Sequence, residues 1–339
     1  MSIPDGAGPV GDFESSGQPP PGVETPGYSN TAPPGRKKTS EEALLTLLIC
    51  PVRGCGEPLE RRERALVCPR GHSFDVARSG YANLLQPQDR RSKVPGDSRA
   101  AVEARRRLLD AGYGAPLLRA LLKEIGTLDL PPGAAVLDVG CGEGYYLGSY
   151  LGSLARQRSL AAHGVDLSTL AVDLAARRYP EVAWTVANAD RSLPYATGAF
   201  DLILSIDARL HPAEMRRVLK TGGRLLVAVP GPDDLVELRA AVLGEGRLRD
   251  RLEMTAGRLA ADFEIEAQRT VRDGARLGPA EIRDALAATY RLRDSRLAAV
   301  AGLDDGKAAG VEVTLSHRLA RFRPRSSPGT VGSSPSATS

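Results

Sequence analysis

The sequence predicts an α/β fold in which a doubly wound parallel sheet follows a small N-terminal module. Two observations predict it. From about residue 117, short apolar strands alternate with helices, and this alternation is typical of a parallel sheet with helices on both faces. Upstream, three of the four cysteines of the chain fall within residues 50–68, and a histidine follows shortly after. That grouping indicates a ribbon stapled by a metal ion.

Composition places the folded part between two tails. The 339 residues, 42% of them hydrophobic and 25% charged, can form one large or two moderate domains. Residues 1–40 and 324–339 are rich in proline, glycine and serine, so we expect both to be disordered. A formal net charge of +4 is too small to identify a nucleic-acid partner by itself.

The sequence also bears on the compartment. The first tail contains no apolar signal segment, and no run approaches the roughly twenty apolar residues that a membrane helix requires. We therefore expect no membrane association. The use of cysteine fits the reducing conditions of the cytoplasm.

The metal-binding prediction rests on the spacing C-x4-C-x12-C-x3-H, formed by Cys50, Cys55, Cys68 and His72. Zinc takes thiolate and imidazole ligands in a tetrahedron, and two short turns can each supply a pair of them. Both turns contain proline and glycine, and PLERRERALVC between them predicts two short strands. Disulfides are the alternative, which the missing signal segment disfavours. We expect a zinc ribbon over residues 41–86.

A basic linker and helix, residues 87–115, follow the ribbon. Asp97 or Ser98 is expected to cap the helix. The basic side chains could neutralise several phosphates of RNA or DNA, or they could form an ordinary solvated surface, and charge alone does not decide between the two. These basic residues are Arg90, Arg91, Lys93, Arg99, Arg105, Arg106 and Arg107.

The larger domain, residues 116–323, is expected to contain five strands. A helix near residues 115–127 leads into the first strand, AAVLDVG, which ends in a glycine-rich turn and a second helix. HGVDLS, VAWTVAN and FDLILSI are the next strands, with STLAVDLAARRYP as a crossover helix, and the helix PAEMRRVLK precedes the fifth strand, GGRLLVAVP. Ligands of such sheets bind at the carboxyl edge of the strands. Trp184 and Tyr195 are expected in the core, although Tyr195 could also stack on a base.

The carboxyl edge carries a glycine-rich run, DVGCGEGYY, and a carboxylate on the neighbouring strand. Glycines let the backbone pass close to a ligand. Asp166 ends the second strand, where its carboxylate can accept hydrogen bonds from ribose hydroxyls. The other candidate cofactor residues here are Asp138, Gly140, Gly142 and Glu143, with Gly144 completing the turn.

Two cofactors are candidates for this edge, a nicotinamide dinucleotide and S-adenosylmethionine. Dinucleotide-binding turns read G-x-G-x-x-G and cradle a pyrophosphate. Here the order is G-x-G-x-G, which Asp138 precedes and which contains Glu143; these carboxylates would repel pyrophosphate but suit a sulfonium cation that also carries an ammonium group. The sequence therefore predicts a class I (Rossmann-like) S-adenosylmethionine methyltransferase sheet with a small N-terminal zinc ribbon.

The motifs together resemble a known family. The run CPxxxCxxPLxxxxxxLxCPxGHSFDVARSGYANLL, followed by PGDS, ARRRLLDAGY, VLDVGCGEGYY, GVDLS, ARRYP and PGPDDLVEL, is similar to the RlmA-type 23S rRNA guanine-N1-methyltransferases, which include macrolide-resistance enzymes of antibiotic producers. The similarity covers about residues 50–238. It implies methylation of N1 of a guanine in a hairpin of the macrolide-binding region of 23S rRNA, and it admits a role in antibiotic self-resistance. The resemblance does not decide whether the protein forms a homodimer.

The resemblance implies roles for individual residues. The cysteine and histidine quartet would hold zinc, and the ribbon with its basic linker would grip the RNA. The DAGYG segment would close over the cofactor, and the residues after the third strand would lie near the adenine. The residues implied to contact the cofactor are Tyr113, Gly114, Gly142, Glu143, Asp166 and Asn188 or Asp190.

Three departures from the family pattern fall near the expected methyl-acceptor pocket. Asp234 stands where a histidine is usual, Ala208 and Arg209 stand where an alanine-proline pair is usual, and ALAATYRLRDSR replaces a segment with methionine and tryptophan. Loss of the guanine N1 proton requires an acceptor. Asp207, Asp233 and Asp234 are the candidates, of which Asp207 and Asp234 are preferred; each could instead be a turn or cap residue.

Two other function classes are compatible with this sequence. A small-molecule methyltransferase of natural-product assembly could use the same scaffold, and a binding protein could keep the cofactor site after losing catalysis. The ribbon and the arginine-rich linker favour RNA, because a small acceptor needs neither.

Overall fold

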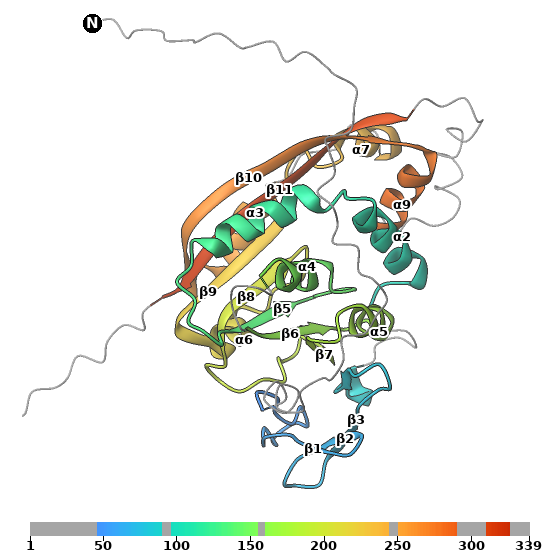
Figure 1. The fold of residues 1–339 in the computed structure, drawn as a ribbon. Helices are drawn as coiled ribbons and strands as arrows, with labels where there is room; N and C mark the ends of the chain where they lie inside the picture. Colours follow the sequence, from blue (N-terminus) through green and yellow to red (C-terminus); the bar gives the residue numbers. More distant parts are fainter. Residues whose placement is uncertain (1–45, 90–95, 155–159, 244–249, 290–309, 326–339) are drawn as a thin grey trace, which may run out of the picture. The chain divides into compact units, whose positions relative to one another are not determined.

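The computed structural model describes residues 46–89, 96–154, 160–243, 250–289 and 310–325, all of which belong to one compact unit beginning at Lys38. Within them, strands β10-β11-β9-β8-β5-β6-β7-β4 form one sheet in that order, and β1-β2-β3 form a second, smaller one (Figure 1). The first predicted tail lies outside the described residues. The second does so from residue 326 onward. No described helix has both the length and the apolar character needed to cross a membrane.

The five predicted strands are confirmed. They are β5 (Ala135–Val139), β6 (Ala161–Asp166), β7 (Ala183–Val186), β8 (Phe200–Ile206) and β9 (Leu219–Pro230). All pair in parallel, β6 and β7 on one side of β5 and β8 and β9 on the other. The strand order therefore reverses between β5 and β8, and the carboxyl ends of strands at such a reversal form a binding crevice.

Helices cover the sheet and connect its strands. Ser98, not Asp97, caps the predicted linker helix, since its hydroxyl accepts a hydrogen bond from the Ala101 amide at 3.2 Å. Ser168 caps the crossover helix between β6 and β7 in the same way. The helices are η1 (Pro87–Asp89), α2 (Arg99–Asp110), α3 (Ala115–Gly126), α4 (Tyr145–Leu154), α5 (Thr169–Arg178), α6 (Pro212–Val218), α7 (Val236–Leu243), α8 (Arg251–Leu259) and α9 (Pro279–Thr289).

Two long antiparallel strands were not predicted from the sequence. β10 (Phe263–Leu277) and β11 (Val311–Pro324) pair with each other, and β11 pairs with β9. The many charged side chains of β10 face solvent along the edge of the sheet, so the strand lacks the apolar run of a buried parallel strand. β11 ends at Pro324, the first residue of the predicted second tail. This pairing sets His317 opposite Pro230, at the carboxyl end of β9.

The zinc ribbon has three short strands, one more than predicted. They are β1 (Glu60–Arg62), β2 (Ala65–Val67) and β3 (Ser73–Asp75), joined antiparallel. A further strand, β4 (Ala82–Asn83), follows the ribbon and pairs in parallel with β7. The large sheet therefore takes its last strand from the segment that leads out of the ribbon.

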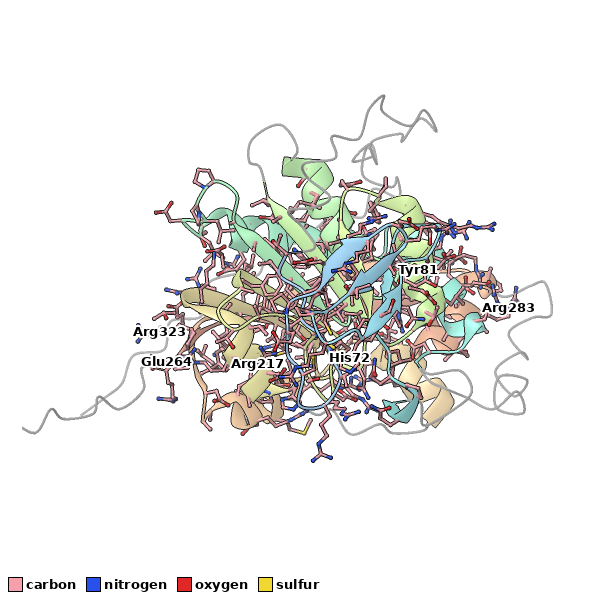
Figure 2. The ribbon with its side chains drawn as sticks, turned by 90° about the horizontal axis from the view of Figure 1, so that it is seen from below. His72, Tyr81, Arg217, Glu264, Arg283 and Arg323 are labelled. Atoms are coloured by element: carbon pink, nitrogen blue, oxygen red, sulfur yellow. The ribbon has the colours of Figure 1, made fainter. Side chains whose placement is uncertain are left out.

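The ribbon and the large sheet share one apolar core. Leu48, Leu66 and Phe74 of the ribbon belong to the same buried cluster as Tyr195 and Phe200, and each such buried side chain contributes about 1.5–3 kcal/mol. The Ile49 amide donates to the Pro194 carbonyl at 3.0 Å. Arg217 on α6, labelled in Figure 2, holds this segment by donating to the carbonyls on either side of Pro194.

The core contains a histidine with no polar partner among the described residues. His163 on β6 is fully buried, and both of its ring nitrogens lack a hydrogen bond there. Tyr195 and Phe200 meet its ring edge to face, at centroid distances of 5.6 and 5.3 Å. Burial lowers the pKa of His163 to about 3, so the folded protein keeps this ring neutral. Tyr195 and Trp184 are buried, as expected.

Replacing His163 with phenylalanine should remove one source of acid sensitivity. Below pH 6.5, the ordinary histidine pKa, His163 becomes protonated in the unfolded chain. In the folded protein it stays neutral until about pH 3. The free energy of unfolding should thus fall by up to about 1.4 kcal/mol per pH unit in that window. Urea unfolding of wild type and His163→Phe between about pH 7 and about pH 5 measures the difference. Equal slopes in the two proteins would contradict the prediction.

Candidate active site and metal centre

The four predicted zinc ligands meet at one point. The ligand atoms of Cys50, Cys55, Cys68 and His72 all lie within 4.8 Å of one another. His72 Nδ1 is 3.4 Å from Cys50 Sγ and 3.3 Å from Cys68 Sγ, and the Sγ atoms of Cys55 and Cys68 are 3.9 Å apart. Ligands bound to one tetrahedral zinc at about 2.0–2.3 Å are separated by about 3.5–3.8 Å. The donor set and its spacing therefore fit zinc.

Two tight turns bring the ligands together. The Cys55 amide donates to the Val52 carbonyl, and the Gly71 amide donates to the Cys68 carbonyl. Gly54 and Gly71 have φ values of +74° and +83°, a backbone region that favours glycine. None of the four cysteines, all of which lie in the described residues, is joined in a disulfide, and three of them meet His72 in a donor set that fits zinc. His72 is labelled in Figure 2, where the ribbon lies in front of the sheet.

The glycine-rich turn after β5 is shaped by its neighbours. A side chain at Gly140 would place its Cβ 2.4 Å from the Cβ of Ala208, and one at Gly144 would come within 2.6 Å of Trp184. At Gly142 the nearest group would be the Arg105 guanidinium, 3.8 Å away. Gly140 and Gly144 thus let the turn pack against the protein, whereas Gly142 lies on its more open side.

Buried carboxylates surround this turn. Asp138 and Glu143 are 2% and 4% exposed, and one oxygen of each lacks a partner among the described residues. Burial raises the pKa of Asp138 to about 8, with smaller contributions from Asp166 and Glu143. Burial also raises the pKa of Glu143. A ligand that brings positive charge and hydroxyl donors would relieve this cost, and S-adenosylmethionine brings both.

Asp166 is fixed at the end of β6, facing the turn. Its Oδ2 accepts from the Gly142 amide at 3.0 Å, and its Oδ1 accepts from the Ser168 amide at 2.7 Å. Burial raises its pKa more than these two hydrogen bonds lower it. The carboxylate is therefore oriented before any ligand arrives, which lowers the entropic cost of binding a ribose.

Arg105 and Asp97 reach the same edge and were not predicted to do so. Arg105 pairs with Asp97 at 2.7 Å, and its charge acts on Glu143 and Asp166. The linker lies against the strand end here, since a Cβ at Gly96 would come within 2.8 Å of Ser168. The sequence signal was the PGDS motif before α2. From the sequence, Arg105 is expected only as a candidate RNA contact.

The remaining predicted cofactor residues fall into two groups. After β7, Asn188 Oδ1 accepts from the Asp190 amide at 3.1 Å, and Asp190 pairs with Arg209 at 3.1 Å. Gly114 packs closely on Tyr145 of α4. Tyr113 points elsewhere, because its hydroxyl donates to the Arg276 carbonyl and its ring packs on the apolar cluster beside α9. The placement of Tyr113 gives no support to its predicted cofactor contact.

The two preferred acid-base candidates meet a third group that was missed. Asp207 follows β8 with a φ of +52°, and its Oδ2 lies 3.2 Å from Nε2 of His317 on β11. Asp234 follows β9 and accepts from the Ser316 amide at 2.8 Å. Asp233, the third candidate, instead pairs with Arg272 at 2.7 Å. No signal pointed to His317, because its strand was not predicted.

Burial and neighbouring charges shift the pKa values of Asp234 and His317. Burial raises the pKa of the Asp234 carboxyl. Burial by itself would lower the pKa of His317, but the charges of Asp207 and Asp234 and the hydrogen bond to Asp207 outweigh it, so the pKa of His317 is raised. The neighbouring carboxylates therefore favour the protonated form of this imidazole.

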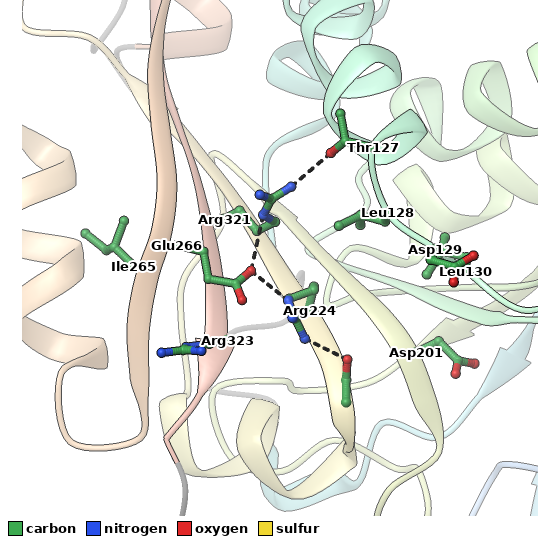
Figure 3. Close-up of a pocket in the computed structure, with 11 residues that line it drawn as sticks. Thr127, Leu128, Asp129, Leu130, Asp201, Arg224, Ile265, Glu266, Arg321 and Arg323 are labelled. Carbon is green, nitrogen blue, oxygen red and sulfur yellow. Dashed lines mark hydrogen bonds and ion pairs between the residues drawn. The ribbon is translucent and has the colours of Figure 1, made fainter.

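A cavity of about 640 Å³ lies away from this chemistry. Its lining includes residues 127–130 before β5, Asp201 at the start of β8 and Gly222 in the first half of β9 (Figure 3). These residues lie toward the amino ends of the parallel strands. Arg224 and Arg321 in its wall both pair with Glu266, and Arg321 also donates to Thr127. We interpret these contacts as a stabilising network and not as part of the active site.

The chain is similar to known proteins in both the ribbon and the sheet. A model of the RlmA N-terminal zinc ribbon matches residues 48–93, and a methyltransferase-domain model matches residues 136–226. The chain is 40% identical to the 23S rRNA (guanine(748)-N(1))-methyltransferase of Streptomyces fradiae over 239 residues, 69% of this chain and 81% of that one. A chain of Micromonospora griseorubida, to which 23S rRNA (guanine-N1) methylation is ascribed, is 34% identical over 304 residues, 83% and 98% of the two chains. The cofactors are zinc and S-adenosylmethionine.

Cys68→Ser should release the zinc and destabilise the whole fold. A hydroxyl is a poor zinc ligand compared with a thiolate, and the ribbon shares its core with the sheet. We expect metal content to fall from about one zinc per chain to well below half, with a lower melting temperature. Elemental analysis of the purified protein measures the first, and calorimetry the second. Cys141→Ser, which removes the thiol outside the quartet, should keep its zinc; equal zinc in both variants would show that the ligand set is wrong.

Proposed function

The chain belongs to the RlmA-type 23S rRNA (guanine-N1)-methyltransferases, and from this membership we propose that it transfers a methyl group from S-adenosylmethionine to N1 of a guanine in a hairpin of 23S rRNA. The observation that carries the proposal is that a zinc ribbon and a methyl-donor edge share one core. A surface held at a fixed place beside the donor edge suits a large substrate that must be gripped at a distance from the reacting base.

The ribbon offers charge suited to RNA. Its exposed basic residues could contact phosphates, and such contacts position a nucleic acid without reading its sequence. A small-molecule acceptor would need none of them. The exposed arginines of the ribbon and the segment that follows it are Arg53, Arg61, Arg62, Arg64, Arg70 and Arg78.

The donor edge would hold the cofactor through its carboxylates. In this proposal Asp166 accepts hydrogen bonds from the ribose hydroxyls, and Asn188 or Asp190 lies near the adenine. Asp138 and Glu143 are buried carboxyl groups; burial raises their pKa values and so disfavours their ionised forms, which the ammonium and sulfonium groups would stabilise. The bound cofactor supplies an electrophilic methyl group. The protein's own residues orient it, exclude water and receive the target base.

The target base must leave the RNA stack to reach this edge, at a cost of a few kcal/mol. Asp207 and Asp234 lie where β8 and β9 end, on the side of the sheet where the base would enter. We propose these two carboxylates as part of the acceptor site. The proposed target lies in the macrolide-binding region of the RNA, and its methylation would protect a producing cell from its own antibiotic.

Methyl transfer to RNA tests the function directly. Purified protein with radiolabelled S-adenosylmethionine should methylate a 23S hairpin transcript, and mass mapping should locate the methyl group on N1 of one guanine. Binding of the transcript should weaken steeply with salt, because several phosphate contacts release counterions.

The cellular arm compares 23S rRNA and macrolide susceptibility in cells with and without the gene. The modified guanine should disappear when the gene is removed, and susceptibility should rise. Absence of RNA methylation, or binding without a salt slope, would remove the RNA proposal and leave a small-molecule acceptor as the alternative.

Asp166→Ala should weaken cofactor binding by about 1.5–3 kcal/mol, the usual contribution of hydrogen bonds to a charged group. The reason is loss of the carboxylate that is held at the end of β6 by two backbone amides. Titration calorimetry with S-adenosylmethionine measures the change. Glu312→Ala, which removes an exposed carboxylate paired with Arg276, is the matched control. An affinity equal to that of the control would argue against a ribose contact.

A further inference from the structure

Three strands that are distant in sequence bring an imidazole into contact with one carboxylate, Asp207, and into the field of a second, Asp234. His317 lies on β11 opposite Pro230, where β9 ends, and its Nε2 is 3.2 Å from Asp207 Oδ2. Asp207 follows β8, and Asp234 follows β9 and is bonded to the amide of Ser316, next to His317. Figure 1 shows β8, β9 and β11 side by side at this edge. The His317 side chain is 20% exposed, so a ligand at the edge could reach it.

We propose that His317 is the general base that accepts the N1 proton of the target guanine, with Asp207 orienting its ring. This inference rests on the function proposed above. The sequence suggested only carboxylates as acceptors of the N1 proton, whereas this inference assigns the proton to a histidine.

The group lies beside the methyl-donor edge. Ala208, the residue after Asp207, touches the glycine-rich turn so closely that Gly140 has no room for a Cβ. Tyr146 stands in the first turn of α4, directly after the glycine-rich turn. Burial raises its pKa, and the charges of Asp207, Glu143 and Asp138 raise it further. Tyr146 therefore shares the electrostatic environment of the cofactor carboxylates and of Asp207.

The proton transfer balances with the methyl transfer. N1 of guanine bonds to the methyl carbon as the carbon-sulfur bond breaks, and the electron pair of that bond stays on sulfur, giving the neutral thioether product. The N1 proton passes to Nδ1 of His317. When Nε2–H is donated to Asp207, the neutral ring carries its lone pair on Nδ1. The charges of Asp207 and Asp234 stabilise the imidazolium that forms, and it returns its proton to solvent after product release.

Histidine suits this step better than either carboxylate. A general base works best when its pKa lies near the working pH, and the two carboxylates raise the pKa of His317 from its ordinary value against the effect of burial. Two arginines also face the group, but each is engaged. Arg272 on β10 pairs with Asp233, and Arg239 on α7 donates to the Pro232 carbonyl. The carboxylates therefore dominate the field at His317.

Rate and pH measurements on the full-length protein test the assignment. His317→Gln should lower kcat on the hairpin transcript by about 10²-fold or more, the usual contribution of a general base, while the KM for RNA and the calorimetric affinity for S-adenosylmethionine change little. Wild type should lose activity on the acid side as His317 becomes protonated. The variant should lack that limb, and added imidazole should restore part of the rate to His317→Ala.

A second variant keeps the histidine and changes its partner. Asp207→Asn removes the charge that raises the pKa of His317, so the acid limb should move to lower pH. Arg323→Gln, a change at the other end of β11 that removes an exposed ion pair with Glu264, is the control and should keep the wild-type profile.

The outcomes separate the two proposals. If wild type methylates the transcript but His317→Gln keeps the wild-type kcat and acid limb, His317 is not the base. An acid limb unmoved in Asp207→Asn overturns the assignment even if His317→Gln fails to fold. If wild type methylates no 23S hairpin, the proposed function fails, and this inference falls with it.

Discussion

The continuous apolar core between the ribbon and the sheet is the constraint on which the rest of the molecule depends. Leu48, Leu66 and Phe74 pack into the same cluster as Tyr195 and Phe200. Arg217 fixes the segment around Pro194, because it donates to the carbonyls on either side of that residue. A zinc ribbon this small has too little surface to form a core of its own. Zinc fixes its turns, and the sheet supplies the apolar surface that fixes its position. A ribbon held in this way can present a large substrate at a constant distance from the donor edge.

The donor edge brings several buried carboxylates together, at a cost in electrostatic free energy. Asp138 and Glu143 are buried beside the glycine-rich turn, and Asp166 faces it. Carboxylates brought together away from water destabilise the protein by itself. A cationic cofactor with ribose hydroxyls relieves that cost, so selectivity for S-adenosylmethionine over a pyrophosphate-bearing dinucleotide follows from the same charges. Arg105 partly balances the edge from α2, which couples the linker to the cofactor site.

Local patterns could predict the zinc quartet and the five parallel strands, because ligand spacing and apolar runs are written in short stretches of sequence. They could not predict β10 and β11. The outer strand alternates charged and apolar residues, and the register of the pair is set by contact with β9, which no local pattern encodes. Tyr113 illustrates the same limit. Its motif suggested a contact with the cofactor, but its hydroxyl donates to the Arg276 carbonyl, which is distant in sequence.

The sequence by itself determined the class of chemistry. Cysteine and histidine spacing specifies a metal, and a glycine turn flanked by carboxylates specifies a cationic cofactor, since donor chemistry depends on residue type. Only the tertiary structure decided which groups meet around the acceptor site. Asp207, Asp234 and His317 come from three strands whose neighbours are chosen by long-range pairing and a shared core. Side chains up to 110 residues apart become partners there because the sheet sets their positions.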